Sequence, residues 1–399
     1  MPSLATGEIR TEAKRSYMSI IGLYLFIYYG TGSFFPLMAQ YYQSIGLSGT
    51  QIGTISSITP IISIFAQPIW GMLCDKLRVR RPILMLALLA SSAISLLFTQ
   101  ISTFAWVVVV FSLFSLFQCA VIPINDSIAL NFAKQQNMQF GNLRLWGSVG
   151  YAIATLITGY AIRSWGPHAI FFFFAAATVL AIVFLRGLSD EGDNVKVNGN
   201  IFNGIGELVR MPRFVLFLMG AFFIFGPINA NNTWFSLYYE HIGGTVVGIG
   251  VAFLLFAGSE APFMKVAGYF ARRWGLETTI LIAAVASGIR WFWYSTAPTT
   301  TMVIAMFFIQ GLSVGFYLAT AAQFVRENTP SSLQVTALTL YSSMGLGLGS
   351  MFCNLVGGVI KDTYGILHTY TFFGIATMIG LVPLLLIKLR TKAKITEMQ

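Results

Sequence analysis

The sequence predicts an all-α integral membrane protein with twelve transmembrane helices in two pseudo-symmetric six-helix bundles. Three observations lead to this fold class. Apolar residues make up 56% of the 399 residues and charged residues only 10%, whereas soluble domains carry about 25% charged residues. Twelve apolar stretches are long enough to cross a hydrocarbon core, which takes about 20 helical residues. Finally, a glycine pattern in the first half returns in the second half.

The repeated pattern marks corresponding turns in the two halves. Ile45-Gly46 corresponds to Ile242-Gly243, 197 residues later, and Gly71 corresponds to Gly268 at the same separation. Both Gly71 and Gly268 precede a short basic turn. A strongly apolar chain built from two copies of one unit can form a cleft between its halves, which is typical of secondary transporters.

The expected spans define the domain organisation. An N-terminal six-helix bundle is predicted at 1–187, a cytoplasmic linker at 188–211 and a C-terminal six-helix bundle at 212–399. The first part of the linker is polar and rich in Gly and Asn, as a flexible connection should be, and its end could form a short amphipathic helix. The approximate limits of the spans are 17–43, 51–72, 83–100, 104–130, 141–163, 168–187, 212–239, 247–270, 279–297, 300–325, 333–360 and 368–388.

Lysine and arginine are unevenly distributed among the turns. The turns at 73–82, 131–140 and 271–278 contain basic residues, while those at 44–50 and 240–246 contain none. Because positively charged turns stay in the cytoplasm, a multi-pass protein of the plasma or inner membrane is predicted, with both termini cytoplasmic. The net charge of +10 is thus explained by topology and contact with the lipid bilayer, and nucleic acid is not an expected partner.

Two pairs of intramembrane charges are the strongest functional candidates. Asp126 and Arg144 lie equally far from the turn between their antiparallel spans, so they should reach the same depth. Glu260 and Arg290 are likewise equidistant from Gly275, about 20 Å along their helices. A charge inside a membrane is costly and by default marks a pathway or a site. The alternative is two salt bridges that only fix helix positions, but buried pairs are a poor source of stability.

Other polar residues give weaker signals. Asn125 and Gln310 could line a cavity, although a lone amide in a span more often hydrogen bonds a neighbouring helix. The three cysteines lack paired spacing and the three histidines do not cluster, so neither a metal site nor a cofactor is expected. A G-x-S-x-G match at 311–315 lies within a span and lacks acid and histidine partners. We therefore expect the chain not to be an enzyme.

A first motif carries a resemblance to a known family. Gly71-x-x-x-Asp75-Lys76, followed by two arginines, resembles the motif between the second and third helices of the major facilitator superfamily. The resemblance implies the major facilitator fold. In that family the motif latches the cytoplasmic side in the outward-facing state, a role that would fall here on Gly71, Asp75, Lys76, Arg80 and Arg81.

A second motif narrows the resemblance. Phe140-Gly141-x-x-Arg144-x-Trp146-Gly147, with an aspartate upstream, is similar to the proton-coupled branch that contains lactose permease and phenylpropionate permease. This likeness implies substrate binding by acids and arginines of both halves and stacking of an aromatic side chain on the substrate ring. The implied substrate-binding residues are Asp126, Arg144, Tyr151, Glu260 and Arg290. Asn125 and Gln310, chosen only as polar residues within spans, complete the set of expected substrate-binding residues.

The proton-carrying group of lactose permease is missing. Its tenth helix has a His and, one turn on, a Glu, where this chain reads Gln310-Gly311-Leu312-Ser313. If protons are coupled here, Glu260 or Asp126 must carry them. Burial disfavours a charged carboxylate and a nearby arginine favours it, and spacing alone does not decide between these effects.

These features together predict a secondary active transporter. The expected activity is proton-coupled symport, taking up a small organic solute such as a sugar, nucleoside or aromatic acid by alternating access. The expected partners are a small-molecule substrate, protons and lipid, and the expected state is a monomer. The alternatives are a proton-driven efflux antiporter of hydrophobic compounds and a non-transporting membrane sensor. Substrate identity and transport direction stay open at this point.

Overall fold

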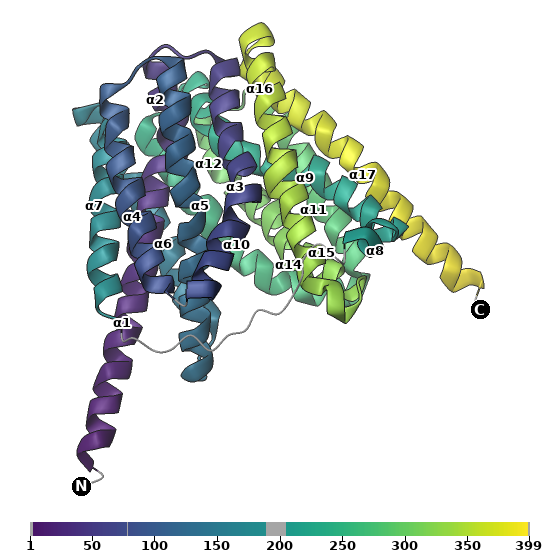
Figure 1. The fold of residues 1–399 in the computed structure, drawn as a ribbon. Helices are drawn as coiled ribbons and strands as arrows, with labels where there is room; N and C mark the ends of the chain where they lie inside the picture. Colours follow the sequence, from purple (N-terminus) through teal and green to yellow (C-terminus); the bar gives the residue numbers. More distant parts are fainter. Residues whose placement is uncertain (1–2, 78, 189–204, 398–399) are drawn as a thin grey trace. The chain divides into compact units, whose positions relative to one another are not determined.

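The computed structural model describes residues 3–77, 79–188 and 205–397, which are almost wholly helical and contain no strand within these ranges (Figure 1). The elements up to residue 188 are α1 (Ser3–Phe34), η1 (Phe35–Leu37), α2 (Met38–Ser44), α3 (Gly49–Leu77), α4 (Arg80–Leu97), η2 (Phe98–Gln100), α5 (Phe104–Gln135), α6 (Phe140–Trp165) and α7 (Ala169–Arg186).

The remaining elements begin at residue 205. They are α8 (Ile205–Val209), α9 (Pro212–His241), α10 (Val246–Trp274), α11 (Leu276–Ser295), α12 (Thr300–Ala305), α13 (Phe307–Gln310), η3 (Gly311–Gly315), α14 (Phe316–Glu327), η4 (Ser331–Leu333), α15 (Gln334–Ser342), η5 (Ser343–Gly349), α16 (Ser350–Tyr364) and α17 (Ile366–Glu397).

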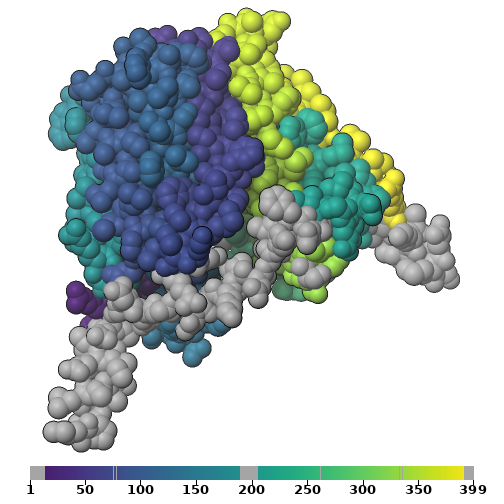
Figure 2. Space-filling view, viewed as in Figure 1, coloured from purple at the N-terminus to yellow at the C-terminus, as the bar shows by residue number. Residues whose placement is uncertain are grey.

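Contacts divide the chain into two compact units. The first consists of Met1–Ile45 and Ile62–Val197, and the second of Gly46–Ile61 and Asn198–Gln399. In the first unit α1 packs against α6 and α7, and α4 packs against α5 and α7. Side chains close the spaces between helices on the visible face of this unit (Figure 2). In the second unit α17 packs against α9 and α11, while α10 packs against η3 and α14.

The expected bundle boundaries at 1–187 and 212–399 stay a prediction. The contact units assign residues 46–61, the N-terminal part of α3, to the second unit. Most of the expected linker lies outside the described residues. Its described end contains the five-residue helix α8.

The predicted all-α membrane fold is confirmed. Eleven helices among the described residues are long and apolar enough to cross a membrane. The expected span at 279–297 is not one of these eleven but corresponds to α11, a helix of 20 residues. Its buried Arg290 lowers the mean hydropathy of that helix. Even so, α11 packs along α17 and α14 as part of the second unit.

The repeated Ile-Gly pair has the same backbone geometry in both halves. Gly46 follows α2 with a φ of +82°, and Gly243 follows α9 with a φ of +85°. Positive φ is accessible to glycine without the steric penalty that a Cβ brings, and it commonly ends a helix. The sequence repeat thus reflects a shared turn after corresponding helices.

Two expected spans are less regular than a continuous α-helix. The span expected at 300–325 is divided into α12, α13, η3 and α14, and the one expected at 333–360 contains η5. Both η3 and η5 are π-helical and rich in glycine. Such segments are rare and are often found at functional sites.

Candidate functional site

In the first unit, three helices bring their polar side chains together at Asp126. The Tyr24 hydroxyl on α1 donates a hydrogen bond of 2.6 Å to Oδ1 of Asp126 on α5. Nη1 of Arg144 on α6 lies 3.9 Å from Oδ2 of the same carboxylate. The structure therefore brings together the acid and the arginine that sequence spacing placed at one depth.

The two charges differ in how far they are enclosed. The Arg144 side chain is 54% exposed, against 21% for Asp126. A distance of 3.9 Å is an ion pair without a close hydrogen bond, so most of the five guanidinium donors are not used by Asp126. Tyr28, one turn after Tyr24, also interacts electrostatically with Arg144, and the two tyrosine rings stack with their centroids 6.0 Å apart.

Glycines of α6 explain how these groups meet. A Cβ on Gly147 would lie 2.9 Å from the Tyr28 ring, and one on Gly150 would lie 2.1 Å from the carbonyl oxygen of Leu25. No side chain fits at such distances, so α6 can approach the backbone of α1 only because these positions are glycine. The close approach brings Arg144 within reach of the tyrosines on α1.

The remaining candidates of this unit are Asn125 and Tyr151, for which no contact with Asp126 is described. Asn125 is 1% exposed, and no hydrogen-bond partner is described for its side-chain amide. Tyr151 is part of the close contact between α1 and α6, where its carbonyl oxygen lies beside Gly32. Tyr24, in contrast, was not a sequence candidate. Its position one turn before Tyr28 on the same face of α1 is the signal that could have identified it.

In the second unit, Arg290 on α11 is enclosed by aromatic rings. The side chain is 1% exposed, and within the described ranges none of its three nitrogens has a hydrogen-bond partner. Its Cζ lies 4.0 Å from the centre of the Trp291 ring, a cation–π contact. Tyr294 and Tyr370 interact with it electrostatically. A buried guanidinium with unused donors is costly, which makes this position a candidate site.

Glu260 is close to Arg290 without forming an ion pair. The two groups interact electrostatically, but among the described residues no ion pair within 4 Å joins them. The carboxylate instead accepts a long contact of 3.5 Å from Nε2 of Gln310. The second pair therefore differs from the first, in which the acid and the arginine make direct contact.

The π-helical segment η3 accounts for the position of Gln310. A Cβ on Gly311 would lie 2.5 Å from Oγ of Ser259, and one on Gly315 would lie 2.8 Å from the carbonyl oxygen of Glu260. These glycines let η3 approach α10 closely. Gln310, immediately before η3, consequently reaches the carboxylate of Glu260.

The expected latch residues are only partly described. Gly71 has open space where a Cβ would stand, and Lys76 is in the last turn of α3. Arg80 is buried at the start of α4, and Nη2 of Arg81 donates to the carbonyl oxygen of Leu185 at 3.2 Å. The side chain of Asp75 lies outside the described part of the chain, so the latch stays a prediction. Among the described residues, no group of three His, Cys, Asp or Glu is placed to hold a metal ion.

Two units of long apolar helices with charges inside their spans define a membrane transporter. The profile described as "MFS_1 like family" matches residues 17–372, and the chain belongs to this family within the major facilitator superfamily. It is 38% identical over 370 residues to a maltose permease of Geobacillus stearothermophilus, covering 92% of this chain and 94% of the relative. It is 35% identical over 371 residues to the uncharacterized transporter YwbF of Bacillus subtilis (strain 168), covering 92% of each.

A solved structure agrees on the fold. The crystal structure of the nucleoside transporter NupG has a TM-score of 0.83 at 16% sequence identity and covers 94% of this chain and 99% of that one. The family match and the two relatives confirm the predicted class, a secondary transporter of the major facilitator superfamily.

Proposed function

We propose that this transporter takes up a neutral sugar of the disaccharide class that includes maltose, together with protons. The observation that carries the proposal is the half-exposed Arg144 held beside Asp126 and Tyr24. The maltose permease at 38% identity supports the choice of substrate class.

The chemistry of this group suits a sugar. The Asp126 carboxylate can accept hydrogen bonds from substrate hydroxyls, and the planar Arg144 guanidinium can donate to hydroxyl oxygens on adjacent carbons. The adjoining Tyr28 ring can pack against the apolar face of a pyranose. Because the acid and the arginine compensate each other in charge, the group favours an uncharged polyhydroxyl substrate over a carboxylic acid.

We further propose that Glu260 carries the coupled proton. The carboxylate of Asp126 already contacts an arginine and a tyrosine hydroxyl. Glu260 has no such direct cation, and its described hydrogen bond is a long contact to an amide. A carboxylate in apolar surroundings without a close cation can gain and lose a proton when its surroundings change. Arg290 then attracts the Glu260 side chain when it is a carboxylate and loses that attraction when it is protonated.

We infer that the protein lies in the cytoplasmic membrane as a monomer, with both termini in the cytoplasm, and that it catalyses no chemical reaction on its substrate. The charged turns support this orientation, because the turns at 73–82 and 271–278 are basic and those at 44–50 and 240–246 are not. A C-terminal reporter that is active only in the cytoplasm tests the orientation, and light scattering of the purified protein tests the monomer.

The test of function is uptake into proteoliposomes. Labelled maltose, sucrose, a nucleoside and phenylpropionate are offered with and without an inwardly directed proton gradient. Maltose should accumulate with the gradient and show counterflow without it. Arg144→Ala should abolish both, whereas Arg163→Ala, an exposed arginine at the far end of α6, should leave both intact. Nucleoside transport in place of sugar transport would overturn the substrate class, and proton-driven export of a hydrophobic compound would overturn uptake.

A further inference from the structure

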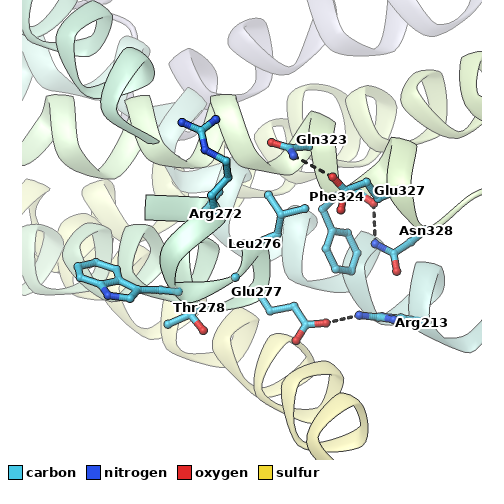
Figure 3. A pocket seen from close by; sticks show the side chains of 12 residues that line it. Arg213, Arg272, Leu276, Glu277, Thr278, Gln323, Phe324, Glu327 and Asn328 are labelled. Carbon is cyan, nitrogen blue, oxygen red and sulfur yellow. Dashed lines mark hydrogen bonds and ion pairs between the residues drawn. The ribbon is translucent and has the colours of Figure 1, made fainter. Parts of the chain in front are cut away.

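A separate cavity opens at one end of four helices of the second unit (Figure 3). Its volume is about 550 Å³, and none of the candidate residues for substrate or proton lines it. It is built from the start of α9, the turn between α10 and α11, and the end of α14. Its charged and amide-bearing side chains are Arg213, Arg272, Glu277, Gln323, Glu327 and Asn328. Since all of these lie at ends of spanning helices, the cavity lies at the level of a membrane surface.

Part of the charge in this cavity is internally compensated. Arg213 forms an ion pair with Glu277 (Figure 3), and its guanidinium carbon lies 5.6 Å from the centre of the Phe324 ring. The opposite charges of the two residues compensate each other. They therefore contribute to the wall of the cavity more than to its capacity for a ligand.

One cation and one anion have capacity left for a ligand. Arg272 is exposed, extends away from the Arg213–Glu277 pair in Figure 3, and has no ion pair in the part of the chain that the structure describes. Glu327 is also exposed and accepts a hydrogen bond of 2.8 Å from the amide of Gln323. This bond leaves most of the acceptor capacity of its carboxylate unused.

An apolar groove adjoins the polar cavity. The groove has a volume of about 340 Å³, and Trp274 lines both spaces. The indole ring of Trp274 lies 4.4 Å from the ring of Phe270, centroid to centroid. Residues of the groove on α10 precede Trp274 by up to three turns, so the groove runs from the helix end toward the middle of the span. It is lined by Pro262, Phe263, Val266, Phe270, Trp274, Ile282, Leu312 and Phe316.

We propose that the polar cavity and the apolar groove together bind one membrane phospholipid whose headgroup carries hydrogen-bond donors. The phosphodiester lies at Arg272, the headgroup donors point to Glu327, and an acyl chain occupies the groove beside Trp274. Guanidinium groups bind phosphate oxygens well, and basic pockets between helix ends are typical of headgroup sites. Tryptophan is enriched at the boundary between the headgroup and acyl regions, because its ring is apolar and its N–H is polar.

The chemistry also selects among lipids. Ethanolamine and glycerol headgroups carry N–H or O–H groups, which can donate hydrogen bonds to the Glu327 carboxylate. A choline headgroup has none, because its nitrogen is fully methylated. A soluble phosphate compound could reach Arg272, but it would leave the groove beside Trp274 unfilled. The site therefore favours phosphatidylethanolamine or phosphatidylglycerol over phosphatidylcholine and over glycerophosphoethanolamine.

Native mass spectrometry of the full-length protein in detergent tests this proposal. Dioleoyl phosphatidylethanolamine, phosphatidylglycerol and phosphatidylcholine, and glycerophosphoethanolamine, are titrated separately, and dissociation constants are taken from the first bound adduct. We expect the ethanolamine and glycerol lipids to bind at least about fivefold more tightly than the choline lipid. Arg272→Gln should weaken the binding of these two lipids by about tenfold, because one charge-assisted hydrogen bond to the phosphate is lost.

The chain offers a matched control for that variant. Arg273 is the next residue, is also exposed, and hydrogen bonds the Tyr269 hydroxyl at 3.1 Å instead of lining the cavity. Arg273→Gln should therefore leave lipid binding unchanged. Glu327→Gln should reduce the preference over the choline lipid without abolishing binding. Melting temperatures in detergent show whether each variant stays folded.

Three results would overturn the proposal. Equal loss of binding in Arg272→Gln and Arg273→Gln would show that general surface electrostatics, and not this cavity, attracts the lipid. Equal affinity for all three lipids would show that Glu327 does not select headgroups by their hydrogen-bond donors. Binding of glycerophosphoethanolamine as tight as that of the intact lipid would assign the cavity to a soluble phosphate compound and leave the groove without a role.

Discussion

The Tyr24 hydroxyl on α1 donates a 2.6 Å hydrogen bond to the carboxylate of Asp126 on α5. It holds one carboxylate oxygen while Arg144 faces the other. Tyr24 thus fixes the orientation of the acid that we assign to substrate binding. Its action on the substrate passes through Asp126, so we describe it as a positioning residue.

Removing that hydroxyl should weaken substrate binding. In Tyr24→Phe the Asp126 carboxylate loses a charge-assisted hydrogen bond, which typically contributes about 1.5–3 kcal/mol. We expect KM for the transported sugar to rise by about tenfold, with expression retained, as measured by initial uptake rates. Tyr29→Phe, a half-buried tyrosine on the same helix, is the control. Equal effects of the two variants would contradict a specific role for Tyr24.

The approach of α6 to α1 should tolerate no side chain at Gly150. A Cβ there would lie 2.1 Å from the carbonyl oxygen of Leu25, so Gly150→Ala should separate the helices and displace Arg144. Overpacking of this kind costs about 1–3 kcal/mol. We expect a lower melting temperature in detergent and loss of transport. Gly141→Ala on the same helix, where no atom lies within 4 Å of the added Cβ, should change neither.

Proton coupling should depend on Glu260. The isosteric Glu260→Gln cannot bind and release a proton, yet it preserves the shape of the site. We expect this variant to lose accumulation driven by a proton gradient while retaining counterflow of labelled sugar. Glu207→Gln on α8, an exposed glutamate, serves as the control. Gradient-driven accumulation that survives in Glu260→Gln would direct attention to Asp126 as the proton carrier.

The start of α3 is capped by a carboxylate far away in sequence. Asp362 on α16 accepts hydrogen bonds from the backbone N–H groups of Gly49 and Thr50 at 2.6 and 2.7 Å, and from the Thr50 hydroxyl at 2.7 Å. A negative charge stabilises the N-terminus of a helix, and loss of a good cap costs about 1 kcal/mol. Asp362→Ala should therefore increase amide hydrogen exchange at Gly49 and Thr50.

A comparison variant locates that effect. Thr50→Val removes the hydroxyl contact alone and leaves both backbone hydrogen bonds to Asp362 in place. It should raise exchange less than Asp362→Ala does. Unchanged exchange at Gly49 in Asp362→Ala would show that the carboxylate contributes nothing to the stability of this helix end.

Much of the fold could be predicted because apolar length and turn chemistry are local properties. The helices follow from spans of about 20 apolar residues, and the repeat follows from glycines such as Gly46 and Gly243, whose positive φ ends corresponding helices. The helix α11 is an exception to this apolar pattern, because it carries the charged Arg290 within the expected span. Local pattern did not predict the π-helical segments η3 and η5, because these depend on glycines packing against another helix.

The candidate site could be predicted only in part. Sequence spacing gives the depth of a residue along a helix axis, and it correctly placed Asp126 opposite Arg144. Glu260 and Arg290, which spacing also places at one depth, interact without an ion pair. Spacing does not specify the rotation of a helix about its axis or its distance from its neighbours, and a direct contact requires both.

The sequence by itself determined the class of protein, its spans and the identity of its intramembrane charges, because hydrophobicity and charge placement in a membrane are properties of the chain. Only the tertiary structure decided which groups meet. It added Tyr24 to Asp126, enclosed Arg290 with aromatic rings and brought Gln310 to Glu260. The physical reason is that these contacts depend on close helix packing, in which glycines such as Gly150 and Gly315 permit backbone approach between residues far apart in sequence.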